Sequence, residues 1–340
     1  MKSKKNKYIL DCTLRDGGYV NNWEFDTCTA RNIIDSLYCS GIRCIEIGIM
    51  GKGGERGKST KFSSFDEMEP LLQNRKHDCR YAVMITQTGA EQFEIPIRSP
   101  YTIDIIRVAY FKKEWQDALQ YAEKLIGKGY EVFLQPMATF MYAEHELEEM
   151  LKRVNILKPK AVYMVDSFSN LYPKDIRKMA NCMLGYLDEA IDFGFHAHNN
   201  MQMAYANVIE FLETNTERNL YVDGSIYGMG RGAGNVPVEL IMEYMNKSEF
   251  AFNIISVLQA YQEYIQPVFQ KYYWGYDHSY FLTASKQMNS VYGWYFLNHG
   301  IRDIIQMSNA LDGIKKENKY TLVRENADEM VDTIRREKRS

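Results

Sequence analysis

The segment YILDCTLRDGGYVNNWEFDTCTARNIIDSLYCSGIRCIEIGI, residues 8–49, contains the first complete strand–helix–strand pattern of the chain. It begins and ends with short apolar runs, at 8–12 and 44–49, that are typical of buried strands. Between the runs, five apolar residues recur at the spacing of one helix face: Ala30, Ile33, Ile34, Leu37 and Tyr38. Asp26 is placed to cap this helix and Gly41 to end it. The segment therefore predicts two parallel strands joined by a crossover helix.

Strand-like runs of this kind recur along most of the chain. They lie at 8–12, 44–49, 80–85, 103–109, 130–135, 161–166, 193–198 and 221–226. Most gaps are long enough for a helix, and the short third gap leaves room for a one-turn helix or an irregular crossover. Eight strands alternating with helices predict an α/β fold, a (β/α)8 TIM barrel, with a doubly wound open sheet as the alternative. A barrel would place the chemistry at the C-terminal ends of its strands.

The pattern changes after the eighth run. Residues 1–247 are expected to form the barrel, and residues 248–340 a helical C-terminal extension. Residues 248–310 are rich in aromatic side chains and too apolar for a solvated tail, and the charged last 25 or so residues predict a surface helix. The extension is expected to cover the barrel mouth, to form a homodimer or to dock a partner.

Composition excludes several classes of function. Hydrophobic residues make up 46% of the chain and charged residues 25%, which is ordinary for a globular protein. A net charge of −3 does not favour binding to nucleic acid or to an acidic membrane. No apolar run approaches the roughly 18 to 20 residues of a membrane span. Six scattered cysteines without a CxxC pair predict a reduced, cytoplasmic protein.

The stretch GFHAHNN, residues 194–200, places His196 and His198 on the same face of a predicted strand. Two imidazoles in an apolar setting need polar partners, and a metal ion would satisfy both. Asp16 follows the first strand. In a closed barrel only the eighth strand lies between the first and the seventh, so Asp16 can reach the two histidines. This N/O donor set suits Mn²⁺ or Mg²⁺ best, with Zn²⁺, Co²⁺ or Fe²⁺ as alternatives. The competing interpretation is a pair of core histidines bonded to carbonyl groups.

Charged and glycine-rich segments surround these residues. Arg15 would bring a permanent positive charge beside the metal. The segment DGSIYGMGRGAGN, residues 223–235, nominally contains GxGxxA, but no strand with a ribose-binding acid follows, so we interpret it as a substrate-binding or phosphate-binding loop. Asn235 closes this loop as a ligand or a supporting donor. The segment GKGGERGKST, residues 51–60, lacks Walker A spacing and predicts a mobile loop over the barrel mouth.

Taken together, these motifs resemble the DRE-TIM metallolyase superfamily, and within it the 4-hydroxy-2-oxovalerate aldolases. The resemblance rests on TLRDG (13–17), HAHNN (196–200) and GMGRGAGN (228–235), and further on IRVA (106–109), VDS (165–167) and SVYGWYFLNH (290–299). It covers residues 7–247 well and residues 280–300 weakly.

The resemblance implies a divalent metal held by Asp16, His196 and His198, with Asn235 on or near it. A 2-oxo acid would chelate the metal, and Arg15 would face the enolate oxygen. The resemblance also implies supporting or substrate-binding roles for a further group of residues: Glu46, Asp166, Ser167, Gly230 and Gly232. Tyr292 would line the aldehyde side of the substrate.

One position departs from the family pattern. The aldolases have a histidine where this chain has Tyr19, and that histidine acts as the base on the substrate hydroxyl. A phenol titrates near ~10 and is a weak base at neutral pH. Tyr19 would act through a water, another group such as His299 or His145 would serve, or the reaction needs no such base.

The leading hypothesis is therefore a divalent-metal-dependent class II aldolase that acts on a 2-oxo acid. Alternatives within the superfamily are an acyl-CoA/2-oxo acid condensing enzyme of the isopropylmalate or homocitrate synthase type and a 2-oxo diacid decarboxylase. From other classes, a non-haem iron oxygenase and a non-catalytic scaffold remain open. The resemblance also implies an aldehyde dehydrogenase as a partner, whereas a homodimer is the simpler expectation.

Overall fold

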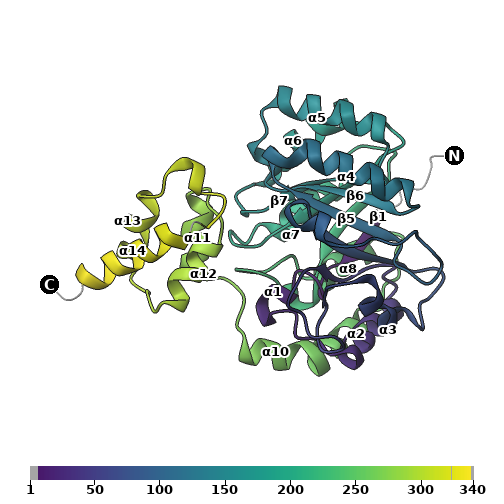
Figure 1. The fold of residues 1–340 in the computed structure, drawn as a ribbon, viewed down its shortest axis with the longest axis horizontal. Coiled ribbons are helices and arrows are strands. Elements are labelled where there is room, and N and C mark those ends of the chain that lie inside the picture. Colours follow the sequence, from purple (N-terminus) through teal and green to yellow (C-terminus); the bar gives the residue numbers. More distant parts are fainter. Residues whose placement is uncertain (1–6, 323, 338–340) are drawn as a thin grey trace.

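The computed structural model describes residues 7–322 and 324–337, and its centre is a closed parallel barrel (Figure 1). Its strands are β1 (Lys7–Asp11), β2 (Cys44–Met50), β4 (Arg80–Thr86), β5 (Ile105–Tyr110), β6 (Glu131–Pro136), β7 (Ala161–Asp166), β8 (Asp192–Ala197) and β9 (Leu220–Gly224). Each strand pairs in parallel with the next, and β1 pairs with both β9 and β2, which closes the barrel. The predicted TIM barrel is confirmed, and the open sheet is excluded.

Helices connect most of the strands on the outside of the barrel. They are α1 (Gly18–Asn21), α2 (Thr27–Cys39), α3 (Glu69–Leu72), α4 (Trp115–Gly127), α5 (Glu144–Leu157), α6 (Pro173–Tyr186), α7 (Ala204–Leu212) and α8 (Val238–Asn246). The segment between β4 and β5 contains only a 3₁₀ helix, Gln87–Gln92, in agreement with the short crossover expected there. A short strand absent from the prediction, β3 (Lys61–Phe62), pairs with the end of β2.

Helix α2 shows how the local sequence determines the element. The Asp26 carboxylate accepts a hydrogen bond from the backbone N–H of Thr29 at 2.9 Å, which satisfies one of the unpaired donors at the helix start. The predicted apolar face is buried at Ala30, Ile33, Ile34 and Leu37. Burial of this face against the barrel, rather than helix propensity alone, stabilises the helix.

The C-terminal extension consists of two parts. The first continues around the barrel as α9 (Ile254–Ala260), a π-helical turn at Tyr261–Ile265 and α10 (Gln266–Lys271), with α9 packed on α2 and α8. The second, which we call the C-terminal lobe, contains α11 (His278–Ser285), α12 (Val291–Asn298), α13 (Ile304–Asp312) and α14 (Arg324–Glu337), drawn at the left of Figure 1. The lobe has a hydrophobic cluster of its own, separate from the barrel core.

The C-terminal lobe touches the barrel at the C-terminal ends of the strands. Phe168, which follows β7, stacks on Tyr320 of the lobe with ring centroids 5.7 Å apart. The side chain of Ser290 lies beside Gly232, in the loop that follows β9. These contacts place the lobe at the barrel mouth. Among the described residues, no helix combines the length and apolar character needed to cross a membrane.

Candidate metal centre

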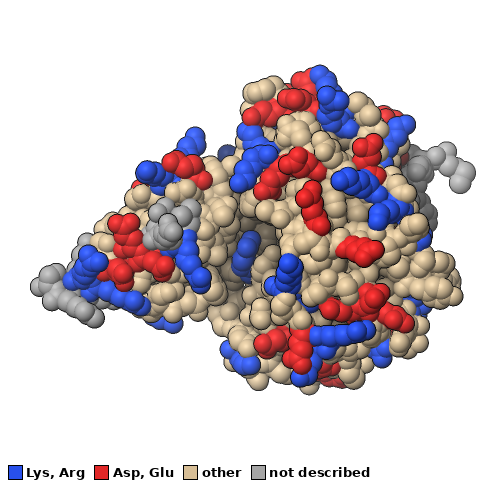
Figure 2. Space-filling model, in the orientation of Figure 1, with Lys and Arg blue, Asp and Glu red and all other residues tan. Residues whose placement is uncertain are grey.

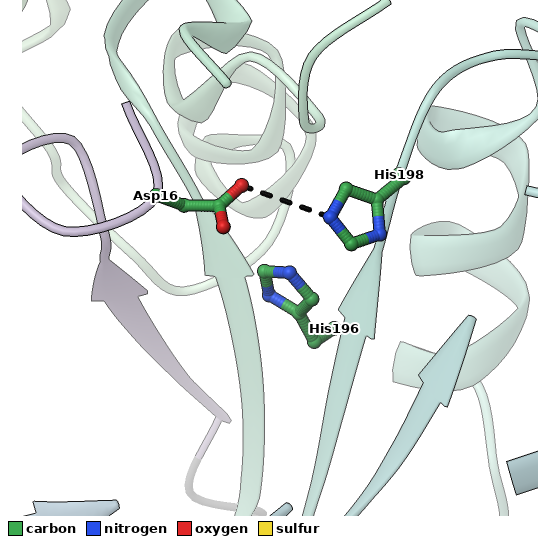
Figure 3. Close-up of side chains that lie close together, drawn as sticks. All are labelled: Asp16, His196 and His198. Atoms are coloured by element: carbon green, nitrogen blue, oxygen red, sulfur yellow. Dashed lines mark ion pairs between the residues drawn. The ribbon is translucent and has the colours of Figure 1, made fainter. Parts of the chain in front are cut away.

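Three side chains converge at the C-terminal ends of β1 and β8 (Figure 3). Asp16, His196 and His198 each offer one ligand atom, and these atoms all lie within 4.8 Å of one another. Asp16 Oδ2 is 3.7 Å from His198 Nε2. All three side chains are buried. The strand register therefore brings together the three residues from which the sequence predicts a metal site.

Hydrogen bonds behind the two imidazoles determine which nitrogen faces the centre. Nδ1 of His198 lies 3.1 Å from the carbonyl oxygen of Asp166, and a carbonyl can only accept, so Nδ1 carries the proton. Nδ1 of His196 lies 2.7 Å from Asp223 Oδ2. Both rings therefore present Nε2 as the ligand atom, and the oxygen that contacts each Nδ1 fixes the orientation of that ring.

The charges at the centre suit a divalent cation. Burial lowers the pKa of His198 to about 3, assisted by His196 and opposed by Asp16, so this imidazole is neutral and able to ligate at neutral pH. Burial alone would raise the pKa of Asp16, but the Arg15 guanidinium holds it below its ordinary value, so the carboxylate is charged.

Two oxygen atoms at the centre have no hydrogen-bond donor within the described ranges. They are Asp16 Oδ2 and Asn235 Oδ1, and both are buried. The amide nitrogen of Asn235 donates to the carbonyl of Met229 at 3.0 Å, and its backbone forms a bridge with His198. A bound cation would satisfy such oxygens, which are costly when left unpaired. These residues therefore fit a divalent metal.

A buried chain of charges runs beneath the centre from Arg15 to His196. Arg15 Nε and Arg107 Nη1 each donate to Glu46 Oε2 at 2.7 Å. Arg107 also pairs with Asp223, which holds His196. Glu46 thus holds Arg15 and Arg107, and its supporting role stays a prediction. The sequence alone had not singled out Arg107 or Asp223. The signal that could have found them is a charged residue inside a buried strand-like run.

Replacing Asp223 with Asn is expected to weaken metal binding by about 10- to 100-fold, the usual effect of losing a carboxylate behind a histidine ligand. The reason is that His196 loses the anionic partner that fixes its tautomer. Titration calorimetry with Mn²⁺ measures the change. The control is Asp192→Asn, at the opposite end of the barrel, where Asp192 pairs with Lys160. Equal Mn²⁺ affinity in Asp223→Asn and wild type would contradict this prediction.

The loop at 228–235 requires glycine at two positions beside the centre. A Cβ on Gly230 would lie 2.5 Å from Asn235 Nδ2 and 3.0 Å from Asp16 Oδ2. Gly232 has φ +70°, and its Cβ would lie 2.7 Å from the side-chain oxygen of Asn200. Asn200 Oδ1 accepts from the backbone N–H of Ala233 at 2.9 Å, a role in holding the loop that the sequence analysis did not assign.

The Gly230→Ala variant is expected to bind Mn²⁺ at least about tenfold more weakly, because Asn235 and Asp16 must move away from the added methyl group. Inductively coupled plasma analysis after dialysis against a series of Mn²⁺ concentrations gives the affinity. Gly127→Ala is the matched control, since a Cβ there meets no atom within 4 Å among the described residues. A Gly230→Ala protein with wild-type affinity would show that the loop adjusts without cost.

Asp166 and Ser167 contribute by holding the backbone. The carboxylate of Asp166 accepts from the N–H groups of Asn170 and Leu171, while its carbonyl positions His198. Burial raises the pKa of Asp166 to about 7, against these hydrogen bonds. Ser167 Oγ accepts from the backbone N–H of Ala138 at 2.8 Å, which joins the loops after β6 and β7.

Tyr19 lies at the barrel mouth, 38% exposed, with its ring against Trp23. Tyr292 lies in the C-terminal lobe rather than beside Asp16 and the two histidines. Its hydroxyl is shared between the carbonyls of Asn318 and Thr321. The role of Tyr292 on the aldehyde side stays a prediction. His145 is exposed near the start of α5, and His299 stacks on Tyr295 in the lobe. A role for either histidine as the base stays a prediction.

Curated proteins with similar sequences are lyases of related kinds. The chain is 28% identical over 244 residues to oxaloacetate decarboxylase of Mycobacterium tuberculosis, covering 70% of each chain. It is 27% identical over 278 residues to 4-hydroxy-2-oxovalerate aldolase of Thermomicrobium roseum, covering 79% of this chain and 75% of that one.

Solved structures share the fold. The "N-terminal domain of a putative aldolase" from Bacteroides vulgatus matches with a TM-score of 0.76 and 25% identity, over 88% of this chain and 99% of that one. The carboxyl transferase domain of Rhizobium etli pyruvate carboxylase matches with a TM-score of 0.71 at 12% identity, over 99% of this chain and 61% of that one. A family model described as HMGL-like covers residues 6–261, more than half of the chain. The chain therefore belongs to the HMGL-like family of the DRE-TIM superfamily.

Proposed function

We propose that this protein is a divalent-metal-dependent carbon–carbon lyase of the class II aldolase type, which cleaves a 4-hydroxy-2-oxo acid through a pyruvate enolate. The observation that supports it best is the state of Arg15. Its Nε and Nη1 are held by Glu46 and Asp16, whereas its buried Nη2 has no hydrogen-bond acceptor in the described part of the chain. A buried, unpaired N–H beside three metal-ligating groups is suited to an oxyanion.

The chemistry assigned to these residues follows from charge. Cleavage of the C3–C4 bond releases an aldehyde as the 4-hydroxyl group loses its proton, which would leave to solvent through a water at Tyr19. The electron pair of the broken bond stays on the pyruvate fragment as an enolate, and a proton added at C3 then gives pyruvate. When bound, the cation would supply positive charge that polarises the 2-oxo group, and Mn²⁺ or Mg²⁺ fits the donors best, with Zn²⁺ or Co²⁺ as alternatives. Arg15 Nη2 donates to the oxygen that gains charge, and Glu46 and Arg107 keep the guanidinium in position.

A 2-oxo diacid decarboxylase is the second candidate, and the replacement of the base by Tyr19 favours it. The loss of CO₂ requires the enolate-stabilising groups but no base on a hydroxyl group. The similarity to a decarboxylase is consistent with this reading. An acyl-CoA condensing enzyme is the third, since it would share the 2-oxo acid and metal positions.

Proton exchange at C3 of pyruvate in D₂O tests the step shared by the two leading reactions. We expect exchange that requires added Mn²⁺ or Mg²⁺ and is visible as loss of the methyl proton signal by NMR. No exchange with any of several metals would contradict the proposal. Assays of aldehyde release from 4-hydroxy-2-oxopentanoate and of CO₂ release from oxaloacetate then separate the aldolase from the decarboxylase. Loss of the thioester of acetyl-CoA in the presence of a 2-oxo acid would identify a condensing enzyme.

The partner and location remain proposals. All six cysteines are free, which is consistent with a reducing compartment such as the cytoplasm. A homodimer and an aldehyde dehydrogenase complex predict different native masses, which native mass spectrometry distinguishes.

A further inference from the structure

Arg231 lies in the glycine-rich loop, one residue after Gly230 and four before Asn235, so the loop that closes the metal centre also carries this cation. The loop holds its backbone in place: the N–H of Gly234 donates to the carbonyl of Arg231 at 3.1 Å, and Ala233 is bonded to Asn200.

The guanidinium of Arg231 lies over an aromatic ring, and among the described residues it has no carboxylate partner. Its carbon lies 5.1 Å from the centroid of the Tyr19 ring, and within the described ranges the side chain makes no hydrogen bond or ion pair. With no acceptor bound to it among these residues, the guanidinium keeps its N–H groups available for a ligand. Those N–H groups are arranged to bind a carboxylate or a phosphate in a bidentate manner.

A second cation lies on the other ring of the same aromatic pair. Trp23 contacts Tyr19 with ring centroids 4.6 Å apart, and Lys61 Nζ lies 5.2 Å from the Trp23 ring. The indole N–H of Trp23 donates to the carbonyl of Arg15 at 2.7 Å. The Tyr19–Trp23 pair is therefore hydrogen-bonded to the backbone of the residue that precedes Asp16. Lys61 likewise has no acidic partner within 4.0 Å among the described residues.

The two buried arginines nearest the centre already face carboxylates. Arg15 faces Glu46 and Asp16, and Arg107 faces Glu46 and Asp223. Arg231 and Lys61 have no counter-ion within 4.0 Å among the described residues, and a divalent cation at the centre would add further positive charge near them. Basic side chains are also visible in the hollow between the C-terminal lobe and the barrel in Figure 2. This excess of positive charge favours a ligand with more than one anionic group.

We infer that Arg231 binds a second anionic group of the substrate, with Lys61 adding positive charge at the Trp23 end of the aromatic pair, so that the substrate class is a 2-oxo acid with a carboxylate or phosphate at its far end. This inference rests on the proposed function, because it assumes that the 2-oxo acid carboxylate lies at the metal centre. It also gives Tyr19 a role as the aromatic platform that orients Arg231, at the position where the related aldolases have a histidine.

The test compares two 2-oxo acids of equal chain length, 2-oxoglutarate and 2-oxopentanoate, by calorimetry in the presence of Mn²⁺. The wild-type protein is expected to bind 2-oxoglutarate at least about tenfold more tightly, since only this acid has a charge for Arg231. In Arg231→Met the two affinities should become equal, and in Arg231→Lys part of the difference should return. Arg153→Met, which removes an exposed arginine from the second half of α5, is the matched control and should keep the difference.

The outcomes separate this inference from the proposed function. Equal binding of the two acids by the wild type, or a preference that survives in Arg231→Met, would overturn the second anionic site alone. Failure of both acids to bind would overturn both proposals.

Aldol addition of pyruvate to glyoxylate, glycolaldehyde phosphate and neutral glycolaldehyde then distinguishes carboxylate from phosphate. Whichever anionic acceptor has the higher kcat/KM identifies the group. A higher kcat/KM for neutral glycolaldehyde than for either anionic acceptor would contradict the inference.

Discussion

Replacing His198 with Ala is expected to abolish tight binding of a divalent cation and, with it, metal-dependent exchange of the pyruvate methyl protons. The loss in Mn²⁺ affinity should exceed the roughly 10- to 100-fold effect of removing a group behind a ligand, because a ligand atom itself disappears. Only Asp16 and His196 would remain of the three groups that converge at the strand ends. Metal analysis of the dialysed protein and calorimetric titration with Mn²⁺ measure the loss.

The control for this variant is His145→Ala, which removes an exposed histidine from α5 on the outer ring. It should bind Mn²⁺ as the wild type does. Circular dichroism establishes that both variants are folded. A His198→Ala protein with unchanged metal content would refute the metal centre and would favour a barrel that acts only as a scaffold.

Replacing Arg15 with Lys is expected to separate metal binding from enolate stabilisation. The three ligating side chains stay in place, so Mn²⁺ should still bind, whereas the exchange rate of pyruvate should fall by ~10²- to 10³-fold, the usual effect of losing one oxyanion donor. A lysine ammonium cannot reproduce the planar fork with which Arg15 reaches Glu46 and Asp16 and still presents Nη2. NMR exchange rates at saturating Mn²⁺ give the effect.

Arg43→Lys is the matched control, since Arg43 forms a part-exposed ion pair with Asp78 on the outside of the barrel. Its exchange rate should equal that of the wild type. If Arg15→Lys exchanged pyruvate protons at the wild-type rate, the enolate would be stabilised by other groups, and the role assigned to Arg15 would be wrong. Loss of Mn²⁺ binding in Arg15→Lys would instead show that Arg15 mainly holds Asp16 in position.

The local sequence determined the barrel and much of the candidate metal centre. Apolar runs and helical spacing are local properties, and eight repeats of strand and helix allow few arrangements other than a closed parallel barrel. Once the barrel closes, strand order alone brings the loop after β1 near the end of β8. The residues Asp16, His196 and His198 could therefore be grouped from sequence, because both histidines lie on one face of a strand.

Only the tertiary structure revealed how the buried charges pair. Arg107, Glu46 and Asp223 lie on β5, β2 and β9, and their pairing depends on which side chains share a layer inside the barrel. Likewise, Arg231 and Tyr19 are more than 200 positions apart in the sequence, and nothing local predicts that they stack. The placement of Tyr292 inside the C-terminal lobe was equally invisible, because a motif gives no information on how a separate hydrophobic cluster packs. Periodic patterns arise from residues that are close in the sequence and can be read from it directly. These contacts join residues that are far apart in the sequence, so they are known only once the chain has packed.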